Sequence, residues 1–127
     1  MGRPAAKDLT ERELEVMHVF WSRGAATAAE ARDRLADSGL DRTYTTIANL
    51  VRGLHEKGFL GQVNAERPYV DRAVRSYEDV SGRLLGDVLE RVFRGSREQL
   101  LLRLVGQGKL TARERAVLEE ILKEQDQ

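Results

Sequence analysis

The sequence of 127 residues predicts a mainly helical fold with one small β-hairpin, followed by a second helical region. Apolar residues recur at helical spacing through most of the chain. A Ser or Thr stands three residues before Glu, Asp or Gln at several places where such spacing begins, which is typical of helix starts. The spacing changes to strand-like alternation once, between residues 59 and 74.

Composition excludes several classes of protein. Lys+Arg and Asp+Glu number 21 each, so the net charge is zero, which argues against a purely electrostatic nucleic-acid binder but allows local patches. The absence of cysteine rules out disulfides, thiolate metal sites and a Cys nucleophile. The same absence is compatible with a reducing cytoplasm, where we expect the protein. No apolar run approaches the roughly 20 residues of a membrane span, so no membrane insertion is expected. Residues 1–8 lack the apolar core of a signal peptide and are expected to form a short disordered arm.

The first two helices are predicted from their caps. The pattern T-E-R-E at Thr10–Glu13 is a capping box ahead of apolar residues at helical spacing, and Gly24 is a suitable end for that helix. A second capping box at Thr27–Glu30 predicts a helix that runs to about Ser38. Gly39–Arg42 is then the turn into a third helix.

The third helix is predicted between Thr43, a suitable N-cap, and Gly58, a typical helix end. Its apolar stripe at i, i+3, i+4 and i+7 consists of Ile47, Leu50, Val51 and Leu54. The opposite face carries Thr45, Thr46, Asn49 and Arg52, with Tyr44 at the leading end. Short donors and acceptors with one guanidinium are the chemistry that reads base edges and phosphates in a major groove. Taken alone, the pattern favours an ordinary amphipathic helix with a solvent face.

The hairpin after this helix changes that interpretation. Two strands are predicted, at Phe59–Val63 and Tyr69–Val74. The segment between them, Asn64–Pro68, contains charged residues together with Asn and Pro, which interrupt strands, and is predicted to form a turn. Two short helices joined by a Gly-containing turn and followed by a hairpin are typical of a winged helix-turn-helix. We therefore predict a winged-helix DNA-binding domain at residues 9–75 that recognises double-stranded DNA.

The expected DNA-contacting residues lie on the third helix, just before it and at the tip of the hairpin. They are Arg42, Thr43, Tyr44, Thr45, Thr46, Asn49, Arg52 and Arg67. We expect Thr45, Thr46 and Asn49 to face base edges. The larger side chains, Tyr44, Arg52 and Arg67, are expected to hold phosphates or the adjacent groove.

Residues 76–127 are predicted to form three helices that begin at Ser76, Ser96 and Thr111. Helices this short cannot form a good core alone, so their leucine surface needs a partner. We expect the same segment of a second subunit, since two-fold dimers are the commonest oligomers. The alternative is that these helices fold back on the winged domain. The expected dimer interface consists of Val80, Leu84, Leu85, Val88, Leu89, Val92, Phe93, Leu101, Leu104, Leu118 and Leu122.

An enzyme is not expected, because the residues of a catalytic or metal site do not gather in the sequence. His18 and His55 have no second histidine at metal-ligand spacing, and Gly106–Gly108 is not a phosphate loop. We expect no metal and no cofactor. A second alternative is a winged helix that binds another protein, which salt-dependent binding to duplex DNA would distinguish from a DNA reader.

Four segments carry a resemblance to a known family. They are L-T-E-R-E-L-E-V-M-H-V-F-W at Leu9–Trp21, Y-T-T-I at Tyr44–Ile47, L-x-x-K-G-F-L at Leu54–Leu60 and V-F-R-G-S at Val92–Ser96. Together they resemble the penicillinase-repressor family of bacterial winged-helix transcriptional regulators. The resemblance implies a homodimeric repressor with a helical dimerisation tail, bound to an inverted-repeat operator and released on a signal. It also implies a membrane metalloprotease sensor as a partner.

The sequence departs from the family pattern at several positions. Gly53 and Glu56 stand where family members usually have basic residues, and Asn49 stands where Thr is common. These changes imply fewer phosphate contacts at the C-terminal end of the recognition helix. The copper-responsive branch of the family has a cysteine cluster near the C-terminus, so a copper-thiolate sensor is not expected here.

Two release mechanisms follow from the resemblance. Some family members are cut in the helical tail, commonly at an Asn-Phe bond; the matching position here is Arg103-Leu104, so that bond is absent. Proteolysis could still occur nearby, at the turn that contains Gly106 and Gly108. The alternative is a ligand-responsive regulator, in which a small molecule between head and tail changes the spacing of the two recognition helices. We favour proteolysis, because the sequence has no ligand-pocket signature.

Overall fold

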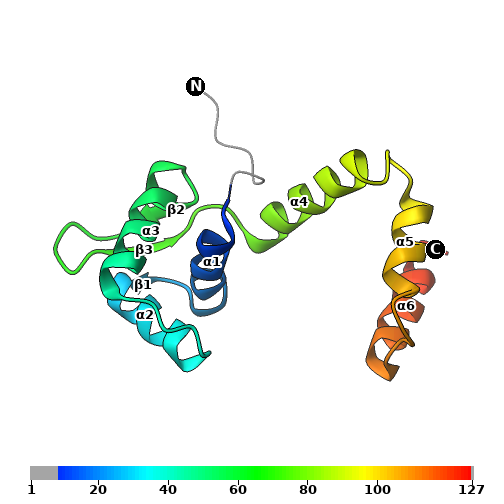
Figure 1. Ribbon diagram of the computed structural model, residues 1–127, viewed down its shortest axis with the longest axis horizontal. Helices are drawn as coiled ribbons and strands as arrows, with labels where there is room; N and C mark the ends of the chain where they lie inside the picture. Colours follow the sequence, from blue (N-terminus) through cyan, green and yellow to red (C-terminus); the bar gives the residue numbers. More distant parts are fainter. Residues whose placement is uncertain (1–8, 127) are drawn as a thin grey trace. The chain divides into compact units, whose positions relative to one another are not determined.

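A computed structural model describes residues 9–126 of the chain, which form two compact units divided between Gly86 and Asp87 (Figure 1). The expected disordered arm, residues 1–8, lies outside the described residues. The first unit contains three helices, a small sheet and the start of a fourth helix, and the second contains the rest of that helix and two more.

The helices of the first unit begin where the sequence caps predicted. The first, α1 (Glu11–Arg23), starts at a capping box between Thr10 and Glu13. The second, α2 (Ala28–Asp37), starts at the same arrangement between Thr27 and Glu30. The third, α3 (Tyr44–Glu56), is capped by the hydroxyl of Thr43. Each cap satisfies a backbone N–H that the first helical turn leaves without a partner.

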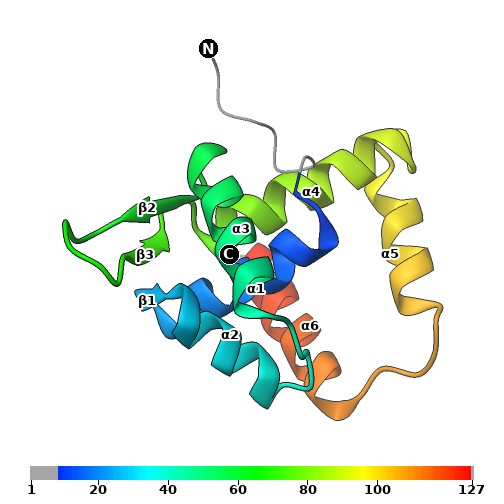
Figure 2. The same cartoon turned by 60° about the vertical axis from the view of Figure 1, so that its left-hand side comes forward.

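The sheet has three short antiparallel strands in the order β1-β3-β2. The hairpin strands are β2 (Leu60–Gln62) and β3 (Val70–Ala73), paired from Leu60 opposite Ala73 to Gln62 opposite Asp71. The added strand β1 (Ala26–Thr27) pairs with the other edge of β3. The loop between β2 and β3 projects away from the helices in both views (Figures 1 and 2). This is the wing of the predicted winged helix.

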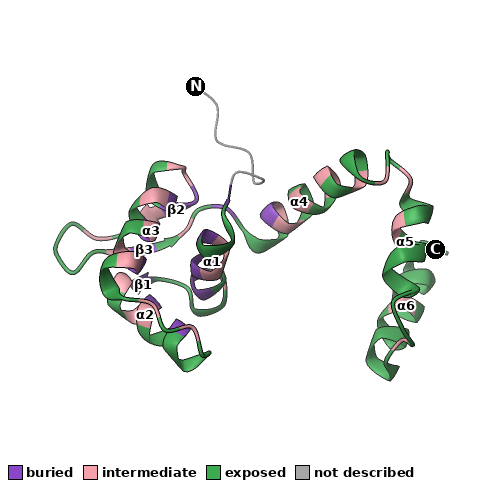
Figure 3. Ribbon diagram, viewed as in Figure 1, coloured by how far each residue is buried: buried purple, intermediate pink, exposed green. Residues whose placement is uncertain are grey.

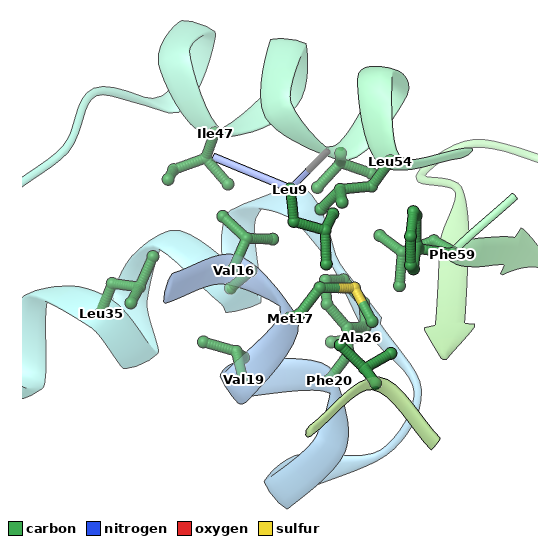
Figure 4. Close-up of a cluster of buried hydrophobic side chains, with 14 residues drawn as sticks. Leu9, Val16, Met17, Val19, Phe20, Ala26, Leu35, Ile47, Leu54 and Phe59 are labelled. Carbon is green, nitrogen blue, oxygen red and sulfur yellow. The ribbon is translucent and has the colours of Figure 1, made fainter. Parts of the chain in front are cut away.

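The core of the first unit lies between α1, α2, α3 and the sheet (Figure 4). Its largest fully buried side chains are Phe20, Phe59, Met17, Ile47, Leu54, Val16 and Val80. Val80 belongs to α4 (Tyr77–Arg91), so the start of this helix completes the core of the first unit. The expected boundary after residue 75 differs from this division, because α4 contributes to the first unit before it enters the second.

Trp21 and Arg75 join the end of α1 to the chain that leaves the sheet. The indole Nε1 donates a hydrogen bond of 2.9 Å to the carbonyl oxygen of Arg75. The buried Arg75 guanidinium lies 4.5 Å from the centre of the Phe59 ring and pairs with Asp79. Trp21 is therefore a packing residue.

The second unit has no core of its own. Its helices are α5 (Arg97–Val105) and α6 (Ala112–Gln125), and none of the residues described from 87 to 126 is buried. Figure 3 shows no buried segment on α5 or α6. Both helices nevertheless have capped starts, at Ser96 and Thr111. No helix in the described part of the chain is long and apolar enough to cross a membrane.

Candidate nucleic-acid interface

The outer face of α3 is a ridge of exposed side chains spaced four, three and four residues apart. This outer ridge consists of Thr45, Asn49, Arg52 and Glu56. It lies opposite the apolar stripe, where Ile47 and Leu54 are completely buried. Burial of the stripe fixes the rotation of α3 about its axis, so the ridge faces outward because the core requires it.

Thr43 organises the N-terminal end of α3. Its hydroxyl accepts the Thr46 N–H at 3.2 Å and donates to the Thr46 hydroxyl at 2.9 Å. Both threonines were expected to contact DNA, and the structure places both hydroxyls in the helix cap, with Thr46 half-buried beside the ridge. Tyr44 is 51% exposed, and the first turn of α3 has no acidic residue. The positive end of the helix dipole is therefore open to a phosphate.

Arg42 pairs with a carboxylate, although it was expected to contact DNA. Its Nη2 lies 3.2 Å from each oxygen of Glu15, and both side chains are about one-fifth exposed. The Nε of Arg42 also donates to the Glu15 Oε1 at 3.4 Å, so two guanidinium nitrogens contact the carboxylate in the bidentate form of the arginine–carboxylate pair. It ties the turn before α3 to α1, a positioning role that the sequence analysis did not predict.

Asn49 and Arg52 meet on the outer ridge. The Arg52 guanidinium donates a hydrogen bond to the Asn49 Oδ1, and both side chains are exposed. Their separation of three residues places them one helical turn apart. The structure therefore joins two residues to which the sequence analysis gave separate roles.

The wing is held by Asn64, which the sequence analysis placed only in a turn. Its Nδ2 donates to the carbonyl oxygens of Glu66 at 2.9 Å and Pro68 at 3.1 Å, and its Oδ1 accepts the Val70 N–H at 2.8 Å. The guanidinium of Arg67 lies 5.5 Å from the centre of the Tyr69 ring. The sequence signal for such a network is an Asn in a turn-forming segment, because Asn side chains commonly bond the backbone of their own turn.

The C-terminal end of α3 is anchored by an ion pair. The Nζ of Lys57 lies 2.8 Å from the Oε1 of the buried Glu13. Burial acts to raise the pKa of Glu13, but hydrogen bonds from Lys57 and Thr10 outweigh it and hold that pKa below its ordinary value. Nearby on β3, burial raises the pKa of Asp71, and the charge of His55 partly opposes it.

The residues expected in the dimer interface fall into two groups. Val80 is completely buried in the core of the first unit, and the half-buried Leu84 packs against that core. These two therefore stabilise the first unit, and Val80 is not available to a partner subunit. The remaining residues are exposed or half-buried: Leu85, Val88, Leu89, Val92, Phe93, Leu101, Leu104, Leu118 and Leu122.

The described residues hold no metal-binding group of three or more His, Cys, Asp or Glu side chains. His18 lies edge-on to Trp21, with ring centres 5.2 Å apart, and Tyr77 completes this aromatic cluster. A cleft of about 500 Å³ borders it within the first unit. The cleft is lined by Phe20, Trp21, Gly24, Ala25, Arg72, Ala73, Ser76, Tyr77 and Glu78.

Solved structures share this fold at low sequence identity. A complex of hsRosR (hsRosR-SG) is 15% identical, with a TM-score of 0.57 over 97% of this chain and 96% of that chain. A second complex, hsRosR-S1, is 16% identical, with a TM-score of 0.54 over 95% of each chain. A MarR family protein from Bacillus stearothermophilus is 17% identical, with a TM-score of 0.51 over 94% of this chain and 74% of that chain.

These likenesses establish the winged-helix fold. No curated protein is similar enough to the chain to count as a relative. A family model described as penicillinase repressor matches residues 9–124.

Proposed function

The chain belongs to the penicillinase repressor family and is a DNA-binding transcriptional regulator; we propose that it represses as a homodimer on an inverted-repeat operator. The observation that carries the proposal is the exposed outer ridge of α3 beside a wing with an arginine at its tip. A helix face of short polar side chains suits base edges in a major groove. The wing supplies a second contact to the same duplex.

The contacts divide by chemistry. Thr45 and Asn49 are proposed to face base edges, with Thr46 at the flank of the ridge. Tyr44 and Arg67 hold phosphates or the adjacent groove, where they fix the position of the protein without reading sequence. Arg42 contributes by keeping the turn before α3 against α1 through Glu15.

The dimer is proposed to form through the second unit. Val92, just after α4, is 67% exposed, and Leu104, on α5, is 66% exposed; no residue described from 87 to 126 is buried. An apolar surface of this kind is typical of a protein–protein contact. A second copy is the natural partner, because an inverted-repeat operator has two-fold symmetry and a two-fold dimer presents two identical heads. A role at operator DNA would require a cytoplasmic location, which is therefore part of the proposal.

Release from DNA is proposed to occur by proteolysis in the tail, through a membrane metalloprotease sensor. Arg103-Leu104 lies in α5, and both residues are exposed in the isolated chain. A fragment that ends between about residues 100 and 109 should appear in induced cells. Full-length protein that persists while the regulated genes switch on would instead favour a small-molecule signal.

The function is tested by measuring duplex binding against salt concentration. Phosphate contacts release counterions, so the logarithm of the binding constant should fall linearly with the logarithm of salt concentration. Arg67→Ala should lower the slope by about one and weaken binding to all sequences alike. Arg97→Ala, in the tail, is the matched control. A folded protein without salt-dependent duplex binding would contradict the proposal and favour a protein-binding winged helix.

A further inference from the structure

The ion pair between Arg42 and Glu15 lies just before the start of α3. Arg42 stands two residues before Tyr44, the first residue of that helix, and Glu15 lies on α1. The Nε and Nη2 of Arg42 donate to the Glu15 carboxylate at 3.2 to 3.4 Å, and both side chains are about one-fifth exposed. The guanidinium next to the open, positive end of α3 is therefore already occupied by a carboxylate.

This pairing distinguishes Arg42 from the other two arginines that were expected to contact DNA. Arg52 donates to the neutral side chain of Asn49, and Arg67 lies beside the ring of Tyr69. Both are exposed side chains. In the part of the chain that the structure describes, Arg42 is the one of the three that forms an ion pair with a carboxylate. Arg52 and Arg67 thus keep a positive charge that a phosphate can compensate.

Glu15 disfavours a contact between Arg42 and a phosphate for two reasons. The carboxylate already compensates the charge of the guanidinium, and it repels a second anion that approaches the same group. Movement of Arg42 away from α1 would also leave the largely buried Glu15 carboxylate without this cation, which is costly for a charge in such surroundings. While Glu15 is ionised, the charge of Arg42 is therefore withheld from DNA.

A withheld charge affects unrelated DNA and the operator differently. Binding to unrelated sequences depends almost entirely on phosphate contacts. Binding to the operator also depends on base contacts from the outer ridge of α3, and the same ion pair holds the turn before that helix against α1. Discrimination rises when binding to the wrong partner is made less favourable. The pair removes a phosphate contact from unrelated DNA while it supports the base contacts at the operator.

We propose that Glu15 is a specificity-determining residue that acts through Arg42, by withholding the charge of Arg42 from the phosphates of unrelated DNA. This inference rests on the proposed function. It replaces the expectation that Arg42 contacts DNA, and it gives a role to Glu15, which the sequence analysis did not single out.

The first test measures how salt affects binding to a duplex of unrelated sequence. Glu15→Gln keeps the size of the side chain and removes its charge, so Arg42 becomes available to a phosphate. Between about 50 and 200 mM salt, the affinity of this variant should fall about 3.5-fold more than that of the wild type, because one further phosphate is neutralised. Glu11→Gln makes the same change of charge at an exposed residue of α1 and should follow the wild type.

The second test removes both charges of the pair. The double variant Glu15→Gln/Arg42→Gln has the net charge of the wild type, and its salt dependence should return to that of the wild type. Persistence of the steeper salt dependence without Arg42 would show that Glu15 repels DNA directly, and it would overturn the inference. Circular dichroism checks that each variant is folded, and the first test does not depend on the double variant.

The third measurement compares the operator with unrelated DNA. The operator is identified by selection from random sequences with the wild-type chain. For Glu15→Gln, affinity for the unrelated duplex at about 100 mM salt should rise several-fold, whereas affinity for the operator should rise less or fall. The ratio of the two affinities should therefore decrease, and an unchanged ratio would overturn the role in specificity.

The outcomes separate this inference from the proposed function. If the wild type binds duplexes selectively and Glu15→Gln shows the same salt dependence, the inference is wrong and the regulator stands. Weaker binding of folded Glu15→Gln to unrelated DNA would also overturn it, because the pair would then only support the fold. Absence of duplex binding by the wild-type chain would contradict the proposed function itself.

Discussion

The Nζ of Lys57 lies 2.8 Å from the Oε1 of Glu13, and this ion pair joins the end of α3 to the first turn of α1. The same oxygen of Glu13 accepts the Thr10 N–H at 2.9 Å. One carboxylate thus completes the cap of α1 and anchors the helix that carries the outer ridge.

Glu13→Ala should destabilise the first unit by about 1–3 kcal/mol, because it removes a cap and leaves Lys57 without this carboxylate. Glu13→Gln should cost less, since Gln also completes a capping box. Because the pKa of Glu13 is lowered in the folded state, ionised Glu13 makes its full contribution to the free energy of unfolding above the ordinary glutamate pKa. That contribution is lost as the pH falls through the lower pKa that Glu13 has in the folded protein. Urea unfolding of both variants at several pH values measures the loss of stability and its pH dependence. Glu11→Ala, on an exposed residue of the same turn, is the control, and an equal loss there would contradict the assignment.

Asp71→Asn should stabilise the protein near neutral pH, by on the order of 1 kcal/mol. A gain in stability is expected because burial raises the pKa of the Asp71 carboxyl. The ionised form is costly in the folded state above the folded pKa, and protonation relieves this cost as pH falls through that value. The difference between variant and wild type should therefore shrink on acidification. Thermal unfolding at several pH values measures it, and a constant difference would argue against titration of Asp71.

Asn64→Ala should weaken DNA binding to operator and unrelated duplexes by similar factors, because the wing loop loses three hydrogen bonds. Stability should fall by about 1 kcal/mol. Asn64→Asp keeps the acceptor for the Val70 N–H but turns a carboxylate oxygen toward the Glu66 and Pro68 carbonyl oxygens, so it should weaken binding at least as much as Asn64→Ala. Anisotropy titrations compare the three proteins. Loss of sequence preference without loss of overall affinity would contradict a positioning role for Asn64.

Val92→Asp should convert the dimer to a monomer, because a carboxylate in an apolar interface has no partner. Operator affinity should then fall by about 10²- to 10⁴-fold, since two heads no longer share one binding event. Arg97→Asp introduces the same side chain at an exposed polar position and should leave the dimer intact. Sedimentation velocity measures both variants. A wild-type monomer at micromolar concentration would contradict the proposed interface.

Local signals in the sequence were sufficient for the helix starts and the hairpin. Thr10, Thr27 and Thr111 each form both hydrogen bonds of a capping box, an interaction that spans only three residues. The apolar stripe of α3 likewise predicted its buried face and hence the outer ridge. Such features depend on spacing within one element, which a sequence displays directly.

Features that depend on distant partners were not predictable in this way. Arg42 and Glu15 are 27 residues apart, and nothing in either local pattern indicates the pair. Val80 shares its apolar spacing with the rest of α4, so the pattern could not show that Val80 joins the first core while Val88 stays exposed. Strand β1 has two residues and exists through its pairing with β3.

The most direct test of the proposed function is selection of bound duplexes from a random-sequence library by the wild-type protein. We expect an inverted repeat whose half-sites are centred about 10 base pairs, or a multiple of one helical turn, apart. Affinity for the selected duplex should fall steeply with salt. Enrichment of a single unrepeated site would contradict the dimer, and no enrichment at all would contradict sequence-specific recognition by α3.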